Sequence, residues 1–197
     1  MPVRPRVLPL VVILCAVCSS AAAQWHIGLE IATNSYKGSS QDTSGEPEGR
    51  PGGGLALALL AHRGWGRGGV TLRVSLSNPG FAVAGKSLSI TDKTTGQLLE
   101  VASLFGTRVG GIGPSGAVRI ELGPALHLWD FDGEYRTRLG GIGALAYEWP
   151  VSSRLIGGIR LEGMLSKSWF DATELPPEFE RQLTWRYGVG LGLRYRL

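Results

Sequence analysis

The chain has 197 residues, of which 30 are glycine, 43% are hydrophobic and only 18% are charged. This length allows one domain with a buried core, and the low charge argues against a disordered chain or a coiled coil. The Lys and Arg residues number 20 against 16 Asp and Glu, which gives a net charge of +4 and a pI near 9.3 and raises the question of nucleic acid.

Residues 1–23 have the layout of a secretory signal peptide. Arg4 and Arg6 precede an apolar run over residues 7–18, and small residues follow it. This run is too short to cross about 30 Å of hydrocarbon as a helix, so a membrane anchor is not expected.

Ala21 and Ala23 stand at the −3 and −1 positions of an A-x-A cleavage site. We therefore expect cleavage between Ala23 and Gln24, leaving residues 24–197 as one domain.

Both cysteines, Cys15 and Cys18, lie in the predicted signal peptide. The mature chain then has neither a disulfide nor a thiolate metal site. Two of the excess positive charges also leave with this segment, so nucleic acid is not expected as a partner.

From Gln24 onward, apolar and polar residues alternate with a period of two, which is typical of a β-strand with one apolar face. Most of these segments approach the 9–11 residues that a tilted strand needs to cross a bilayer. We expect eight strands, within residues 25–32, 55–61, 70–77, 97–108, 118–128, 139–149, 155–166 and 183–197. No helical period extends over a comparable length, so the sequence predicts an all-β fold.

The polar face of these strands combines glycines with charged residues of both signs, which favours a barrel interior over a water-exposed surface. Arginine suits buried ion pairs because its planar guanidinium binds carboxylates through two hydrogen bonds. We predict a structural charge network in the lumen from Glu30, Arg73, Glu100, Arg119, Glu121, Arg138, Arg160, Glu162 and Arg186.

Aromatic residues gather at the predicted strand ends, as in the girdles of membrane barrels. The predicted girdle consists of Trp25, Trp65, Trp129, Trp149, Trp169 and Trp185.

Connections between the strands alternate in length, apart from a brief one at residues 130–135. Short periplasmic turns and longer extracellular loops are typical of outer-membrane barrels. The short turns are expected at residues 63–67, 109–116 and 150–153, and the long loops at 35–53, 78–96 and 168–181.

The last predicted strand ends Tyr187-Gly-Val-Gly-Leu-Gly-Leu-Arg-Tyr-Arg-Leu197. With this ending and its overall pattern, the chain resembles the small eight-stranded outer-membrane barrels of the OmpA/OmpX-like superfamily. The resemblance implies an antiparallel up-and-down transmembrane barrel with a packed lumen, surrounded by outer-membrane lipid and lipopolysaccharide. It also implies folding by the barrel-assembly machinery, which reads a terminal aromatic residue where this chain has Leu197. We expect a monomer.

Motifs for bound groups are weak, and we expect neither a cofactor nor a metal. Residues 80–87 match the P-loop pattern, but the residues that follow form a poor helix and secretion removes the chain from cytosolic nucleotide. The interpretation is a non-enzymatic integral outer-membrane protein with an envelope or surface role.

Two alternatives stay open. One is a lipid A-modifying enzyme, similar to the outer-membrane deacylases and centred on His127, although no serine stands at the family's His-x-Ser spacing. In this scheme His26 and His127 face the lumen and His62 sits at a periplasmic turn. The other is a secreted, soluble lipocalin-like binder of a hydrophobic ligand, whose apolar faces would point inward.

Overall fold

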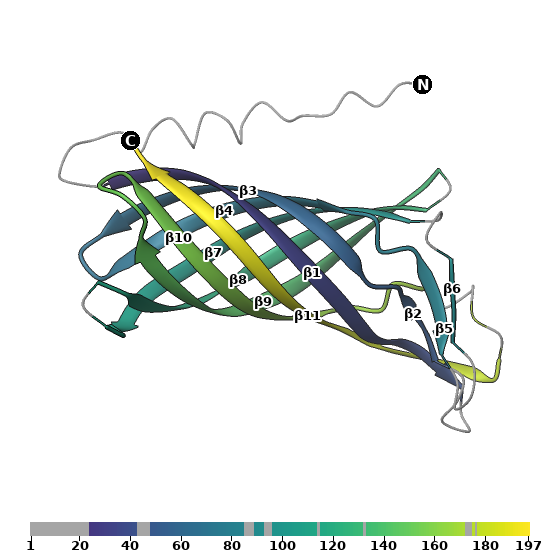
Figure 1. Ribbon diagram of the computed structural model, residues 1–197. Coiled ribbons are helices and arrows are strands. Elements are labelled where there is room, and N and C mark those ends of the chain that lie inside the picture. Colours follow the sequence, from purple (N-terminus) through teal and green to yellow (C-terminus); the bar gives the residue numbers. More distant parts are fainter. Residues whose placement is uncertain are drawn as a thin grey trace.

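The alternating segments form one antiparallel sheet that closes on itself in the computed structural model (Figure 1). The structure describes residues 24–42, 48–84, 89–92, 96–113, 115–131, 133–171, 175 and 177–197, so the predicted signal peptide, including Ala23, lies outside the described residues. In these ranges every regular element is a strand, and no helix is long and apolar enough to span a membrane.

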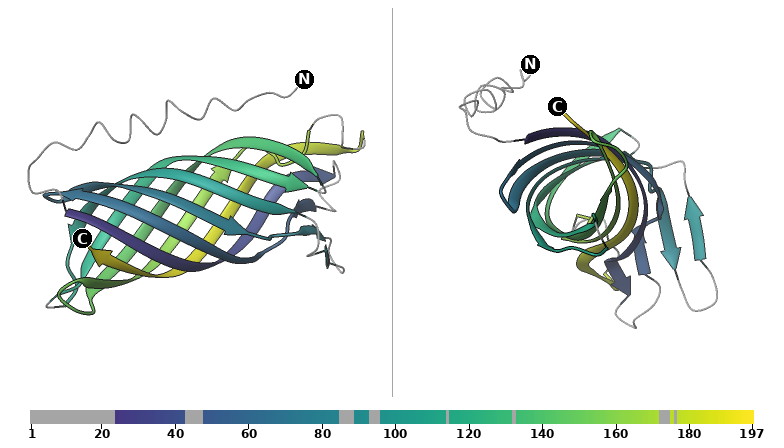
Figure 2. Two further views of the ribbon diagram at one scale, coloured as in Figure 1. Left: turned by 90° about the horizontal axis from the view of Figure 1, so that it is seen from above. Right: turned by 60° about the vertical axis from the view of Figure 1, so that its left-hand side comes forward.

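Eight strands form the barrel wall, and each pairs with its neighbours in the antiparallel sense around the ring (Figure 2). They are β1 (Gln24–Asp42), β3 (Gly54–Trp65), β4 (Gly68–Ser77), β7 (Gln97–Gly110), β8 (Ala117–Phe131), β9 (Glu134–Pro150), β10 (Leu155–Ser166) and β11 (Phe179–Arg196). The ring closes where β1 pairs with β11, from His26 opposite Arg196 to Asp42 opposite Phe179. The predicted eight-stranded up-and-down barrel is confirmed.

Three short strands extend the sheet beyond the ring: β2 (Glu48–Pro51), β5 (Phe81–Ala84) and β6 (Ser89–Asp92). The strand β2 pairs with the far end of β1 and with β5, and β5 pairs with β6. These strands lie at the end of the barrel opposite the C-terminus and the start of β1, and they project from its rim (Figure 1, Figure 2).

The loops predicted at residues 35–53 and 78–96 are therefore partly strand, and the boundaries predicted for them are wrong. The strand β1 continues to Asp42 because its backbone still bonds to β11, although its side chains no longer alternate in polarity. Hydrogen bonding of the main chain does not require an apolar face, so the period-two signal ends before the strand does.

The outer face of the barrel is apolar. Leucine, isoleucine and valine side chains of alternate wall positions are exposed, as in Leu29 at 54%, Leu57 at 53% and Leu59 at 61% exposure. Their neighbours in the sequence, Glu30 and Ala58 among them, are buried. Polar groups are inside and apolar groups outside, the inverse of a soluble barrel.

The ladder between β7 and β8 is interrupted at Pro124, which has no N–H to donate. Paired residues resume on either side, at Ala102 opposite Ala125 and Phe105 opposite Leu122. At Gly123 the strands approach so closely that a Cβ atom would overlap the carbonyl oxygen of Ser103. Glycine is required there by the backbone of the neighbouring strand.

Candidate functional site

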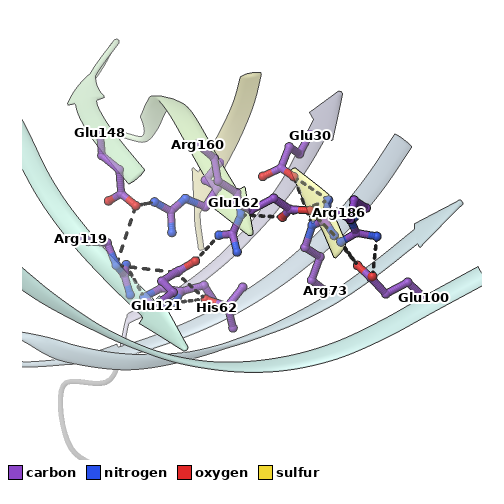
Figure 3. Close-up of polar contacts among 12 residues, drawn as sticks. Glu30, His62, Arg73, Glu100, Arg119, Glu121, Glu148, Arg160, Glu162 and Arg186 are labelled. Carbon is purple, nitrogen blue, oxygen red and sulfur yellow. Dashed lines mark hydrogen bonds and ion pairs between the residues drawn. The ribbon is translucent and has the colours of Figure 1, made fainter. Parts of the chain in front are cut away.

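Ten charged side chains form an unbroken series of alternating sign through the interior (Figure 3). They come from β1, β4, β7, β8, β9, β10 and β11, that is, from every wall strand except β3. We call this set the lumen ion chain; in order it is Glu30, Arg73, Glu100, Arg186, Glu162, Arg160, Glu121, Arg119, Glu148 and Arg194.

Glu100 is the centre of the first half of the lumen ion chain and is fully buried. Arg73 Nη1 donates to its Oε1 at 2.7 Å, and Arg73 Nη2 lies 2.9 Å from Glu30 Oε1. Arg186 Nη1 lies 2.6 Å from Glu100 Oε2, while Nη2 lies 2.7 Å from Glu162 Oε1. One carboxylate thus lies between two guanidinium groups, each of which has a further carboxylate partner.

Arg160 begins the second half, with Nε 3.2 Å from Glu162 Oε2 and Nη1 in contact with Glu121. Arg119 Nε lies 3.8 Å from both Glu121 Oε1 and Glu148 Oε1. Arg194 contacts Glu148 and ends the series. The lumen ion chain contains five carboxylates and five guanidinium groups, so its net charge is zero. Buried charges are stable only when they are paired in this way.

Eight of the nine charged residues that the sequence predicts for the lumen belong to the lumen ion chain, and the exception is Arg138. Sequence reasoning missed Glu148 and Arg194. The signal for both was present, because each stands at an inward position of its alternating strand, between outward-facing aromatic or aliphatic neighbours.

Glycines on the polar face give these side chains room. A Cβ atom at Gly190 would lie 3.2 Å from Cγ and Cδ of Glu30, and one at Gly188 would lie 3.0 Å from Cγ of Glu162. Both distances are shorter than ordinary van der Waals contact, so the glycines of β11 are matched to the carboxylates opposite them.

The three histidines are all buried in the barrel. His127 is completely covered, and its Nε2 lies 3.0 Å from Glu100 Oε2. His62 was predicted at a turn, and that prediction is wrong: it lies within β3 and points inward. A guanidinium only donates, so Arg119 Nη1 donates to His62 Nε2 at 3.1 Å, and His62 Nδ1 then donates to Thr71 Oγ1 at 3.0 Å.

Arg138 does not join the lumen ion chain but binds the segment that follows β10, which turns back into the mouth of the barrel. Its guanidinium donates to the carbonyl oxygens of Ser168 at 2.8 Å and Trp169 at 3.2 Å, and to Asp171 Oδ1 at 2.7 Å. From the opposite side, Ser39 Oγ accepts from Trp169 N at 3.1 Å. Ser39 has a φ of 101° at the register shift of β1, and this bulge turns its side chain inward.

The predicted aromatic girdle is only partly found. Trp25, Trp65 and Trp185 are on the outer surface at 40%, 52% and 45% exposure, and Trp149 is partly exposed against Tyr147.

Placing Trp129 and Trp169 in the girdle is wrong, because they are 2% and 1% exposed and pack against each other inside the mouth. Trp129 is two residues after the inward-facing His127 in the same strand, so the period of two sends it inward as well.

The lumen ion chain links the strands of the wall to one another across the interior. Its ion pairs join strands that are distant in the sequence, and above them an apolar cluster that includes Tyr36, Trp129 and Trp169 fills the mouth. Among the described residues there is no group of three or more His, Cys, Asp or Glu that could hold a metal ion.

A closed antiparallel barrel with an apolar outside and a charged inside is a small β-barrel of the outer-membrane type. The structure is similar to Neisserial surface protein A, with a TM-score of 0.59 at 8% identity over 88% of this chain and 97% of that one. It also matches Ail, the attachment invasion locus protein of Yersinia pestis, at 13% identity over 89% and 100% of the two chains, with a TM-score of 0.40. No family model and no curated protein sequence matches the chain.

Proposed function

We propose that this protein is a non-enzymatic integral outer-membrane protein, whose closed barrel anchors the outer segments β2, β5 and β6 at the cell surface in an envelope or surface-interaction role. The observation that carries the proposal is the inverted distribution of side chains: a continuous lumen ion chain inside and exposed aliphatic residues outside. Exposing this aliphatic surface to water would be unfavourable, whereas the acyl chains of a bilayer are apolar like the surface itself. Lipopolysaccharide and other lipids of the outer membrane are its expected surroundings, and the barrel-assembly machinery its expected route of insertion.

A lipid-facing charge tests this proposal directly. Leu59 is exposed near the middle of β3, between Leu29 and Val74 of the adjacent strands. In a bilayer, Leu59→Lys is expected to lower the free energy of unfolding by about 2–4 kcal/mol. The measurement is urea unfolding of the protein in lipid vesicles, with the gel shift between heated and unheated samples as the sign of a folded barrel.

Leu59→Val is the matched control, because it keeps the position apolar. In a soluble barrel, replacing an exposed leucine by lysine is expected to change the free energy of unfolding by no more than about 0.5 kcal/mol. A neutral effect of Leu59→Lys, together with a protein that stays soluble without detergent, would favour the lipocalin-like alternative.

The alternative of a lipid A-modifying enzyme centred on His127 finds no support in the geometry. The ring is completely buried beside Glu100, whereas a general base for lipid A needs access to the outer, lipid-facing surface. We expect mass spectra of lipid A to be the same from cells that express the protein, its His127→Ala variant or neither. A lipid A species that appears only with the wild-type protein would establish the enzyme instead.

A further inference from the structure

The end of the barrel with the short turns holds a polar cavity of about 350 Å³. Five arginines, two histidines and one carboxylate line it, together with glycines of the turn between β3 and β4. This volume is at the lower limit of sites for small molecules, large enough for a ligand of a few functional groups.

The charge of this cavity is unbalanced. Glu148, its one carboxylate, already contacts Arg119 and Arg194 of the lumen ion chain. The other three arginines, Arg67, Arg108 and Arg196, are exposed and form no ion pair among the described residues. The neutral lumen ion chain therefore ends at a mouth that has three uncompensated guanidinium groups.

The backbone fixes two of these arginines next to each other. Arg108 N donates to the carbonyl oxygen of Arg67 at 2.8 Å, which joins the turn after β3 to the end of β7. The side chains of Arg67, in this turn, and Arg108, in β7, can thus approach one bound group from neighbouring positions.

A buried histidine without a side-chain partner also lines the cavity. His26 is 8% exposed, and no side chain of the described residues forms a hydrogen bond with its ring nitrogens; its ring centroid lies 5.6 Å from that of His62. Arg119 Nε is also buried without a hydrogen bond, because its nearest carboxylate oxygens, those of Glu121 and Glu148, lie 3.8 Å away. Buried donors without partners are unfavourable in a native protein, and a bound acceptor would satisfy them.

We propose that this cavity is a binding site for a small multivalent oxyanion, with phosphate or carboxylate groups, held by the free guanidiniums at the rim and by His26 and Arg119 at its base. Guanidinium groups bind both kinds of oxyanion through paired, charge-assisted hydrogen bonds. Binding requires only the folded barrel; the orientation in the proposed function adds that the site opens to the periplasm.

The test is calorimetric titration of the folded protein in a non-ionic detergent with pyrophosphate, citrate and the neutral sugar trehalose. We expect the wild-type protein to bind at least one of the two anions and not the sugar. The anion that binds with the higher affinity identifies the chemical class of the ligand: pyrophosphate indicates a phosphoryl group and citrate a carboxylate. If neither anion binds, the proposal is wrong.

Variants decide whether the cavity is the site. Arg67→Gln and Arg108→Gln each remove one charge-assisted contact from exposed positions, and each is expected to weaken binding roughly tenfold. Arg181→Gln, an exposed arginine at the opposite end of the barrel, makes the same change in net charge and is expected to leave the affinity unchanged. An equal loss in all three variants would show attraction by net charge alone and would overturn the proposal.

His26→Phe separates a shaped site from a basic rim, because it keeps a ring of similar size and removes both nitrogens. We expect weaker binding by a protein that still shows the heat-dependent gel shift. An affinity equal to that of the wild type would exclude His26 from the site and overturn that part of the assignment.

Discussion

At the scale of single residues, Glu100 lies at the centre of the first half of the lumen ion chain. Its Oε1 accepts hydrogen bonds from Arg73 Nη1 and Arg186 Nη2, its Oε2 lies beside Arg186 Nη1 and His127 Nε2, and it has no exposed surface. Removing one member of a buried ion pair leaves the other charge buried and uncompensated. The resulting loss of stability is larger than the net contribution of the intact pair.

Glu100→Gln preserves the shape of the side chain and removes its charge. We expect the free energy of unfolding in lipid vesicles to fall by on the order of 3 kcal/mol, because two guanidiniums lose a charged partner. Glu180→Gln, on the exposed outer part of β11, is the control and should stay within about 0.5 kcal/mol of the wild type. Equal unfolding midpoints for the two variants would show that the lumen ion chain contributes little to stability.

At the scale of strands, the junction of β7 and β8 is the place where the wall depends most on one residue. Gly123 faces a backbone carbonyl that cannot move aside, next to a proline that interrupts the ladder. We expect Gly123→Ala to destabilise the barrel by about 1–3 kcal/mol, measured by the urea midpoint.

Gly163→Ala in β10 is the matched control for this substitution, since a Cβ atom there would meet nothing within 4 Å. An effect of the same size in both variants would mean that the loss comes from glycine's backbone freedom in general and not from the close approach at Ser103.

The alternation of residues predicted the wall of the barrel and most of its interior, because burial within the ring acts on every second side chain. Glu30 and Arg186 are inside for that reason. The alternation did not predict that β1 continues over residues 35–42, which are held by backbone pairing with β11 and by hydrogen bonds of single side chains such as that of Ser39. Nor did it indicate the inward turn of Ser168 and Trp169, which depends on contacts with Arg138 and Ser39 from distant strands. The arginine-lined cavity was missed because its lining residues come from all eight wall strands and from the turn between β3 and β4.

At the scale of the whole molecule, the two ends of the barrel differ in construction. One end has short turns and the arginine-lined cavity; the other has extended strands and a mouth filled by aromatic side chains. This polarity makes the orientation in the membrane measurable.

Single cysteines report the orientation, because the predicted mature chain has none of its own. We expect a membrane-impermeant maleimide to label Arg181→Cys on intact cells, since this exposed residue lies at the outer end of β11. Val151→Cys, in the exposed turn between β9 and β10, should react only after the outer membrane is permeabilised. The opposite pattern would reverse the proposed orientation, and the parent chain without added cysteine is the control.

The pairing of β1 with β11 also has a consequence for synthesis. The barrel strand synthesised last, β11, is the partner of the barrel strand synthesised first, β1, and it pairs with β10 along its other edge. A chain that stops before β11 keeps two strands with free N–H and C=O groups, which hydrocarbon cannot accept. We therefore expect only chains that include β11 to insert into the membrane. Shorter products are expected to stay outside it, where proteases can remove them.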